Sequence, residues 1–344
     1  MNILVYLIGT SFSHNGSGVA DMNLTYYDLM KQTINVEKID ILEIAKKYYN
    51  CTNETIIRNL ALIKIQKQLK GKNIHVLHTN DLCLTFPVMD MSKNANRKII
   101  TVHDLYPFMK KSEYKSVQKF DDKLKQKNFR FLKGYDHVFV RTNELAIKLG
   151  DSFDVDPKKI TVQGPIIDYR FKPLNDDKNS GKKIIGYINN FTWNKAPMLK
   201  YFIEIFKKLR DDELELHIFG KDFPFNEMIK SDSRIKYFNF LEENKVVPTL
   251  GKFNAYLSTS THEGLGIPIA KAKAMKIPVL CYDGEVPAIM KRNTAVWNQQ
   301  NLEQMLRERT WEKVNVEKAY IDIESMRPDK IVNSTLEVYD KIFI

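Results

Sequence analysis

The stretch Ser258–Tyr282, STSTHEGLGIPIAKAKAMKIPVLCY, decides the fold prediction. The apolar run Ala255–Ser258 predicts a strand that leads into a glycine-containing loop, Thr259–Gly266. A helix is expected over Ile267–Lys276, and a second apolar strand over Pro278–Cys281. The order strand, loop, helix, strand is the repeating unit of a parallel α/β sheet.

The loop has the residues of an anion site. Gly264 and Gly266 allow a ligand to approach the backbone closely, and Pro268 suits the first helical turn because its missing N–H needs no partner there. Free N–H groups at a helix start favour a phosphate. Glu263 would repel that phosphate, so we expect it to hold a hydroxyl group of an attached moiety, as in a nucleotide sugar. The alternative is a loop that merely turns the chain, with Glu263 as a solvated cap.

Composition describes a globular protein of two domains. The chain has 344 residues, 43% of them hydrophobic, and no apolar run reaches the roughly 18–20 residues of a spanning helix. Three scattered cysteines, Cys51, Cys83 and Cys281, and a start that reads as a buried strand indicate a cytoplasmic protein. The net charge of +11 is compatible with a membrane surface, nucleic acid or anionic substrates.

The first half of the chain alternates strands and helices, which predicts a parallel α/β domain. The strand expected over Met1–Ile8 is followed by a polar loop containing Gly16 and Gly18, a second potential anion site. His103 follows the strand expected over Ile99–Val102. Ligands of such sheets lie at the carboxyl ends of the strands, so these residues are site candidates.

A basic stretch, Lys110–Lys133, has an apolar side. It is compatible with a peripheral contact to anionic lipid, with nucleic-acid binding, or with an ordinary solvated surface helix.

The polar stretch Lys172–Lys183 has the composition of a domain boundary, and the α/β pattern restarts after it. We therefore expect an N-terminal Rossmann-like domain over 1–175 and a C-terminal Rossmann-like domain over 176–328. A closing helix over 329–344 is expected to pack back on the N-terminal domain.

Taken together, these motifs resemble the family-4 retaining glycosyltransferases, which have the GT-B fold of two Rossmann-like domains facing each other across a cleft. The matching segments follow the family's order along nearly the whole chain: Gly18-Val19, Thr101–Leu105, Gly164–Asp168, Lys195, Glu263–Pro268 and Pro278-Val279.

Two positions depart from the family's pattern. The second Glu of the family's Glu-x7-Glu motif, which holds the donor ribose, is Lys271 here, and the Arg of its phosphate clamp is Asn189. A lysine cannot accept hydrogen bonds from ribose hydroxyls. Because we expect Lys271 in the first turns of its helix, where a cation is unfavourable, an anion nearby would explain it. Either Lys271 replaces the missing clamp charge, or donor binding has decayed.

The resemblance implies a retaining, metal-independent hexosyltransferase that needs no cofactor. Its donor would be a nucleotide sugar, such as a UDP- or GDP-sugar, and its acceptor a hydroxyl of a glycan, lipid or protein. Carried over residue by residue, the catalytic candidates are Glu263, Lys195 and His103, and the donor-binding candidates are Gly16, Gly18, Asn189, Gly264, Leu265, Gly266 and Lys271. The departures favour one alternative, a GT-B protein that only binds or scaffolds, and the charge favours another, a nucleic-acid acceptor.

Overall fold

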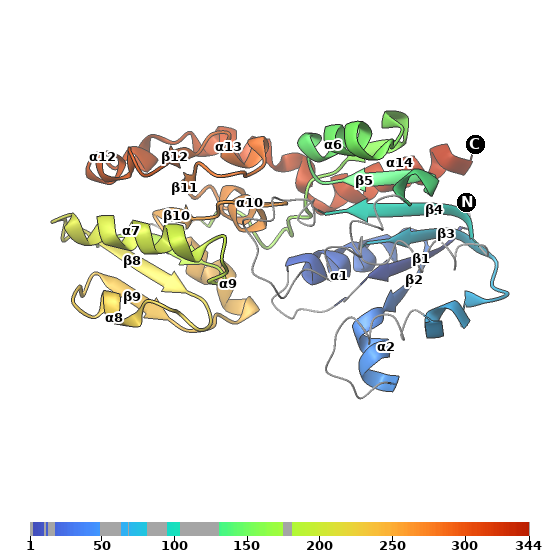
Figure 1. Cartoon of the computed structure of the whole chain (residues 1–344), viewed down its shortest axis with the longest axis horizontal. Helices are drawn as coiled ribbons and strands as arrows, with labels where there is room; N and C mark the ends of the chain where they lie inside the picture. Colours follow the sequence, from blue (N-terminus) through green and yellow to red (C-terminus); the bar gives the residue numbers. More distant parts are fainter. Residues whose placement is uncertain are drawn as a thin grey trace. The chain divides into compact units, whose positions relative to one another are not determined.

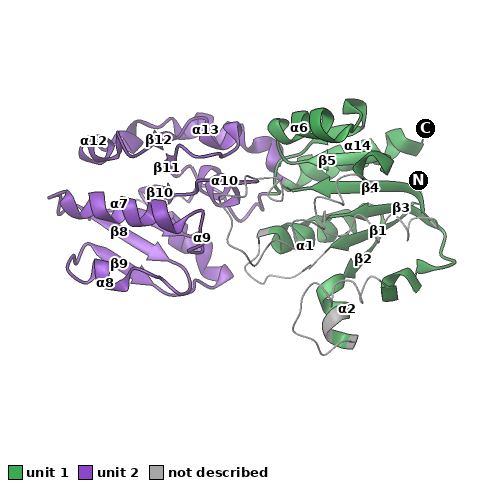
Figure 2. Ribbon diagram, in the orientation of Figure 1, with its two compact units in different colours: residues 1–166, 328–344 green, residues 167–327 purple. Residues whose placement is uncertain are grey.

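The computed structural model describes residues 3–9, 12, 18–48, 63–67, 69–80, 95–103, 131–174 and 181–343. The chain forms two compact units (Figure 2). Unit 1 comprises residues 1–166 together with 328–344, and unit 2 comprises residues 167–327.

The described strands of unit 1 form a six-stranded parallel sheet in the order β2-β1-β3-β4-β5-β6 (Figure 1). Its strands are β1 (Leu4–Gly9), β2 (Asn35–Asp40), β3 (Ile74–Thr79), β4 (Ala95–Val102), β5 (His137–Val140) and β6 (Ile160–Val162). The central strands are buried on both faces, as in β5, where all four residues are buried. Continuous apolar runs of this kind are typical of parallel strands covered by helices.

Helices cover this sheet: α1 (Gly18–Met30), α2 (Ile41–Tyr48), α6 (Asn143–Phe153) and α14 (Pro328–Phe343), with short 3₁₀ turns at Leu132–Gly134 and Pro157–Lys159. Thr142 caps α6 by accepting a hydrogen bond from the Leu145 amide. The last helix, α14, returns to unit 1 and packs against α1, although the residues preceding it belong to unit 2.

A polar network lies inside unit 1, between β3, β4 and α14. His78 Nδ1 lies 2.7 Å from the Tyr339 hydroxyl, and its Nε2 lies 2.8 Å from Thr101 Oγ1. Burial is the main cause that lowers the pKa of His78 to about 3, and the positive charge of Arg141 acts in the same direction. His78 is therefore a neutral core residue, paired at both ring nitrogens.

Unit 2 has a second six-stranded parallel sheet, in the order β12-β11-β10-β7-β8-β9. Its strands are β7 (Lys183–Ile188), β8 (Leu214–Phe219), β9 (Ile235–Phe238), β10 (Ala255–Ser258), β11 (Val279–Tyr282) and β12 (Ala295–Trp297). Its helices are α7 (Ala196–Lys208), α8 (Asn226–Ile229), α9 (Glu243–Gly251), α10 (Ile267–Ala274), α11 (Ala288–Lys291), α12 (Leu302–Arg307) and α13 (Val316–Asp322), with 3₁₀ turns at Thr310–Lys313 and Glu324–Met326.

Two parallel sheets with helices confirm the predicted α/β class. Several sequence predictions lie outside the described residues: Gly16, the polar segment 175–180, and the basic stretch Lys110–Lys133 except for its last three residues. Across the part of the chain that the structure describes, no helix combines the length and apolar character needed to cross a membrane.

Candidate functional site

The predicted loop and helix at the carboxyl end of β10 are present in unit 2. The helix α10 begins at Ile267, and Pro268 occupies its first turn. Gly266 caps it in the left-handed conformation, with φ of 63°. A Cβ atom at this position would also lie 2.8 Å from Met290 Cγ, so glycine is required here both for the backbone angle and for space.

Lys195 and Glu263 form an ion pair, although 67 positions separate them in the sequence. Lys195 Nζ lies 3.3 Å from Glu263 Oε1, and each side chain is only 15% exposed. Ser260 donates a 2.7 Å hydrogen bond to the same oxygen. Glu263 Oε2 accepts from no described residue, so half of the carboxylate remains available to a ligand hydroxyl.

Three loops hold this pair in place. The Thr261 amide donates to the Asn194 carbonyl at 2.8 Å, and Thr259 Oγ1 donates to the Lys195 carbonyl at 3.0 Å. On the other side, the Glu263 amide donates to the Glu285 carbonyl at 3.0 Å. The loops after β7, β10 and β11 are thus tied together at the carboxyl edge of the sheet, where parallel sheets bind ligands.

The other donor-binding candidates of unit 2 lie around the pair. Gly264 and Leu265 complete the loop before α10, and Leu265 is buried. Asn189 follows β7, and its side-chain oxygen accepts a 3.0 Å hydrogen bond from the next amide, that of Asn190. Gly220, which follows β8, passes so close to the Asn189 carbonyl that a side chain would not fit.

The structure corrects one argument about Lys271. Because α10 ends at Ala274, Lys271 lies in the last turn of a short helix, not in its first turns. A cation is favourable there, so helix electrostatics alone explains the residue. Its ammonium lies 4.7 Å from the centre of the Phe171 ring, a cation–π contact.

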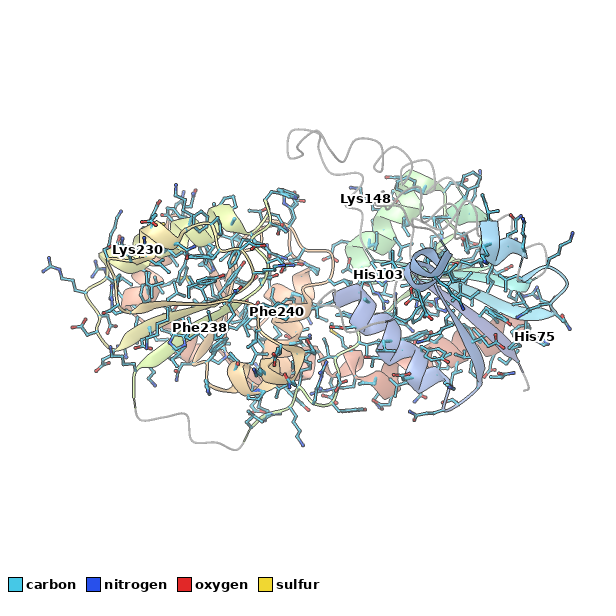
Figure 3. The ribbon with its side chains drawn as sticks, turned by 90° about the horizontal axis from the view of Figure 1, so that it is seen from below. His75, His103, Lys148, Lys230, Phe238 and Phe240 are labelled. Atoms are coloured by element: carbon cyan, nitrogen blue, oxygen red, sulfur yellow. The ribbon has the colours of Figure 1, made fainter. Side chains whose placement is uncertain are left out.

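His103 lies in unit 1, directly after β4 (Figure 3). Its Nε2 lies 2.9 Å from the Asn80 carbonyl, and Arg141 Nε donates to its Nδ1 at 3.2 Å. Because a guanidinium only donates, Nδ1 must accept, and the proton of the neutral ring is on Nε2. Gly18, the other described candidate of unit 1, is the first residue of α1.

Sequence reasoning did not single out three residues of these clusters. Ser260 and Asn194 lie inside stretches that it placed at the active face of unit 2, whereas Arg141 of unit 1 was missed. Ser260 lay inside the quoted loop, three positions before Glu263, a spacing at which a hydroxyl readily reaches a carboxylate. Arg141 follows a predicted strand, as His103 does, and that shared position was the signal that would have identified it.

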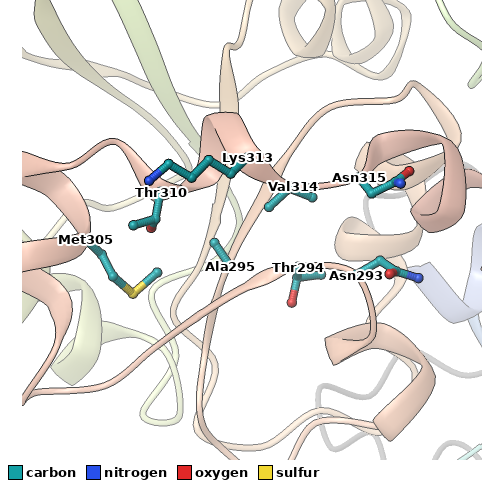
Figure 4. Close-up of a pocket in the computed structure, with 8 residues that line it drawn as sticks. All are labelled: Asn293, Thr294, Ala295, Met305, Thr310, Lys313, Val314 and Asn315. Atoms are coloured by element: carbon teal, nitrogen blue, oxygen red, sulfur yellow. The ribbon is translucent and has the colours of Figure 1, made fainter.

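The described residues also lack the ligand set of a metal site. Within the described residues, no three His, Cys, Asp or Glu side chains lie close enough together to hold an ion. A cavity of about 450 Å³ opens elsewhere in unit 2, where β12 begins (Figure 4). Lys313, Thr310 and Met305 are among its lining residues, and it does not include the Lys195–Glu263 pair.

Comparison with known proteins supports the predicted class, a glycosyltransferase. Residues 182–309, most of unit 2, match the family model described as glycosyl transferases group 1. No curated protein sequence matches the chain.

Solved structures share the fold over the whole chain. A glycosyltransferase from Rickettsia africae is 19% identical with a TM-score of 0.70, covering 100% of this chain and 99% of its own. Sucrose-phosphate synthase from Thermosynechococcus elongatus is 13% identical with a TM-score of 0.75, covering 99% of both chains. An Anabaena protein solved with UDP and glucose is 12% identical with a TM-score of 0.68, covering 98% of this chain and 100% of its own. The chain therefore has the GT-B fold of two Rossmann-like units, as the sequence predicts, and the family match supports glycosyl transfer.

Proposed function

We propose that the protein is a retaining glycosyltransferase that moves a sugar from a nucleotide-sugar donor to a hydroxyl group of a glycan, lipid or protein acceptor. The observation that carries the proposal is the largely buried Lys195–Glu263 pair, each side chain 15% exposed, beside the glycine loop and the start of α10. One cation, one half-occupied carboxylate and free helix N–H groups meet at the ligand-binding edge of a sheet.

In this mechanism the donor pyrophosphate binds to the amides of Gly264–Gly266 and to Lys195. Charge grows on that leaving group as the glycosidic bond breaks, so a lysine already held by Glu263, which Ser260 orients, stabilises the transition state more than the ground state. Glu263 Oε2 accepts sugar hydroxyls. The acceptor hydroxyl attacks from the face of the leaving group, and the departing phosphate takes its proton, so that the anomeric configuration is retained without a metal or a protein nucleophile.

His103 completes the proposal from unit 1. With its proton on Nε2, it offers one donor, which Asn80 occupies in this structure. Contact with a sugar hydroxyl therefore requires that hydrogen bond to be shared or exchanged.

A second candidate function is a GT-B protein that binds a nucleotide or a partner without transferring sugar. The Lys271–Phe171 contact favours it, because this contact gives Lys271 a packing role that needs no donor phosphate. Asn189, in place of a clamp arginine, leaves Lys195 as the cation that we assign to the pyrophosphate.

A panel of nucleotide sugars and free nucleotides, tested by thermal unfolding, separates the two candidates. The panel starts with uridine nucleotides, because the Anabaena structure holds UDP and glucose. A donor at 100 times its dissociation constant adds about 2.7 kcal/mol to the stability. Catalysis predicts a donor-specific shift that Lys195→Ala and Glu263→Ala abolish, together with release of free nucleotide when acceptor is added.

Matched variants make the result specific. Lys200→Ala removes an exposed lysine from α7 and should leave the shift unchanged. Lys271→Ala decides whether that residue contributes to phosphate binding: loss of the shift supports such a role, and retention assigns Lys271 to packing. No shift with any donor at millimolar concentration contradicts the transferase and favours the binding protein.

A further inference from the structure

Arg141 is a buried cation at the ligand-binding edge of the unit 1 sheet. It follows the last residue of β5, Val140, and only 8% of it is exposed. Residues in the same position follow the neighbouring strands of the sheet: Asn80 follows β3, His103 follows β4 and Gln163 follows β6. The guanidinium of Arg141 contacts the residues that follow β4 and β6, and Asn80, after β3, contacts His103.

The partners of Arg141 are all uncharged. Nε donates to His103 Nδ1 at 3.2 Å, and Nη1 donates to the carbonyls of Gly164 at 3.0 Å and Gln163 at 3.5 Å. Within the described residues, no carboxylate lies within ion-pair distance of the guanidinium, and Nη2 has no hydrogen-bond partner. Among the described residues, the arginine is thus held by acceptors at Nε and Nη1 and has no acceptor at Nη2.

An uncompensated buried charge is costly, and buried cations are normally paired. Burial lowers the pKa of Arg141 to about 10, still far above neutral pH, so the group remains charged. The neighbouring ring groups add no counter-charge at neutral pH: His78 is neutral, His103 accepts from Arg141, and burial raises the pKa of Tyr26 to about 12. The helix α6, whose first residue is Asn143, directs its N-terminus to the same edge and adds positive potential.

A guanidinium with these properties is suited to an oxyanion. Arginine binds phosphate and carboxylate groups through its planar fork of donors, and its charge is not lost on desolvation as readily as that of lysine. The hydrogen bonds to Gly164 and His103 fix the fork before a ligand arrives, which reduces the entropy lost on binding.

We propose that Arg141 binds an anionic group, a phosphate or a carboxylate, of the molecule that accepts the sugar. The assignment to an acceptor rests on the proposed function, whereas the anion site itself does not. Unit 2 already provides Lys195 and the glycine loop for the donor phosphates, so the cation of unit 1 is assigned to the second substrate. The acceptor would then carry a negative charge near the hydroxyl that is glycosylated.

The test observes the guanidinium directly in the full-length, ¹⁵N-labelled protein. Arg141→Lys keeps the charge and removes the Nε–H signal, so it identifies that signal in the wild-type spectrum. Glycerol phosphate is then titrated against sodium chloride of matched ionic strength. We expect a saturable shift of the Arg141 signal with glycerol phosphate and none with chloride, both in the wild type and in Lys195→Gln.

Arg97 provides the internal control. It lies near the amino end of β4, at the opposite edge of the same sheet, and its Nε donates to the Ile342 carbonyl at 2.6 Å. Its signal should not move. Thermal unfolding gives a second readout: the increase in melting temperature with glycerol phosphate should be lost in Arg141→Gln and retained in Lys195→Gln.

The two sources of phosphate are separated by a parallel titration with UDP. A shift of the Arg141 signal with UDP but not with glycerol phosphate, abolished by Lys195→Gln, would assign the anion to the donor and overturn the proposal. An Arg141 signal that responds to neither ligand, or equally to chloride, would also overturn it and leave the arginine as a structural cap of the Gly164 carbonyl. Absence of donor binding together with a retained response to glycerol phosphate would reject the transferase but not the anion site.

Discussion

The two units place a cation at the same edge of similar sheets but stabilise it in opposite ways. In unit 2, Lys195 is paired with Glu263, so the site is neutral overall and its loop depends on the left-handed Gly266. In unit 1, the partners of Arg141 among the described residues are an imidazole and backbone carbonyls, all uncharged, so they leave its positive charge uncompensated. The first arrangement can exchange partners when a ligand arrives, whereas in the second the described residues supply hydrogen-bond acceptors but no counter-charge.

The largest expected effect comes from a substitution that breaks the Lys195–Glu263 ion pair of unit 2. Lys195→Ala removes the cation that we assign to the leaving group, and it leaves the Glu263 side chain, only 15% exposed, without its charge partner. We expect kcat/KM for the donor to fall about 10²–10³-fold, the usual loss when one electrostatic stabiliser is deleted. Steady-state kinetics measure it, with the exposed Lys200→Ala as control; a change below threefold contradicts the assigned role.

The next effect tests whether unit 2 depends on backbone conformation. Gly266→Ala introduces strain at φ of 63° and a contact of 2.8 Å with Met290, so we expect a loss of about 2–4 kcal/mol. Gly71→Ala in unit 1 is the matched control, since Gly71 has φ of 80° but open space around it, and should cost only about 1 kcal/mol. Denaturant unfolding measures both, and equal losses would show that the Met290 contact is unimportant.

Acid should weaken unit 1 through its buried histidines His78 and His137, of which His78 has the lower pKa. The folded pKa of His78 is about 3 and its usual value is 6.5, so between these values only the unfolded chain binds the proton. The contribution of His78 to the free energy of unfolding is complete above pH 6.5. It falls as the pH decreases below that value, by about 1.4 kcal/mol per pH unit.

The location of the tryptophans allows this effect to be assigned to one unit. Trp193, Trp297 and Trp311 are the chain's three tryptophans, and all belong to unit 2. Between pH 6 and 4, the transition followed by circular dichroism should weaken more than that followed by tryptophan fluorescence. His78→Gln should reduce this difference between the two transitions. If the stability followed by circular dichroism depends on pH as steeply in this variant as in the wild type, the role of His78 is contradicted.

The smallest expected effect concerns the same network. Tyr339→Phe removes the hydroxyl that lies 2.7 Å from His78 Nδ1, leaves a buried ring nitrogen unpaired, and should cost about 1–2 kcal/mol. Tyr201→Phe, whose hydroxyl donates to the Gln299 carbonyl at an exposed position, should change stability by less than about 0.5 kcal/mol. Similar losses of stability in the two variants would contradict the expectation that a buried hydrogen bond contributes more than an exposed one.

The local sequence pattern was sufficient to predict many of the strands and helices. The apolar runs of β5, β8 and β10, and the proline and glycine around α10, are strong local signals, and the elements appear where these signals predict them. β2 was not predicted, because it is an edge strand with the exposed charged residues Glu37 and Lys38 and lacks a continuous apolar run. The end of α10 was placed two residues too late, which reversed the argument about Lys271.

The contacts within the candidate site were harder to predict from the sequence than the fold, because they depend on which strands are adjacent. Lys195 and Glu263 were each singled out, but the distance between them depends on the adjacency of β7 and β10, which is a property of the strand order. Arg141 was missed because its significance lies in the absence of a nearby carboxylate, and this depends on residues from four strands. Pairings within one loop, such as Ser260 with Glu263, are the contacts that spacing alone can suggest.

The return of α14 to unit 1 has a consequence for synthesis on the ribosome. Thr335 and Tyr339 of α14 are fully buried in unit 1, where Gln163 donates to Thr335 and His78 pairs with Tyr339. Unit 2 is continuous in sequence, so it can fold as soon as residue 327 has left the exit tunnel, whereas the first 166 residues wait for residues 328–344. The nascent N-terminal segment therefore exposes unfinished apolar surface until those residues emerge and is the part most in need of chaperone protection.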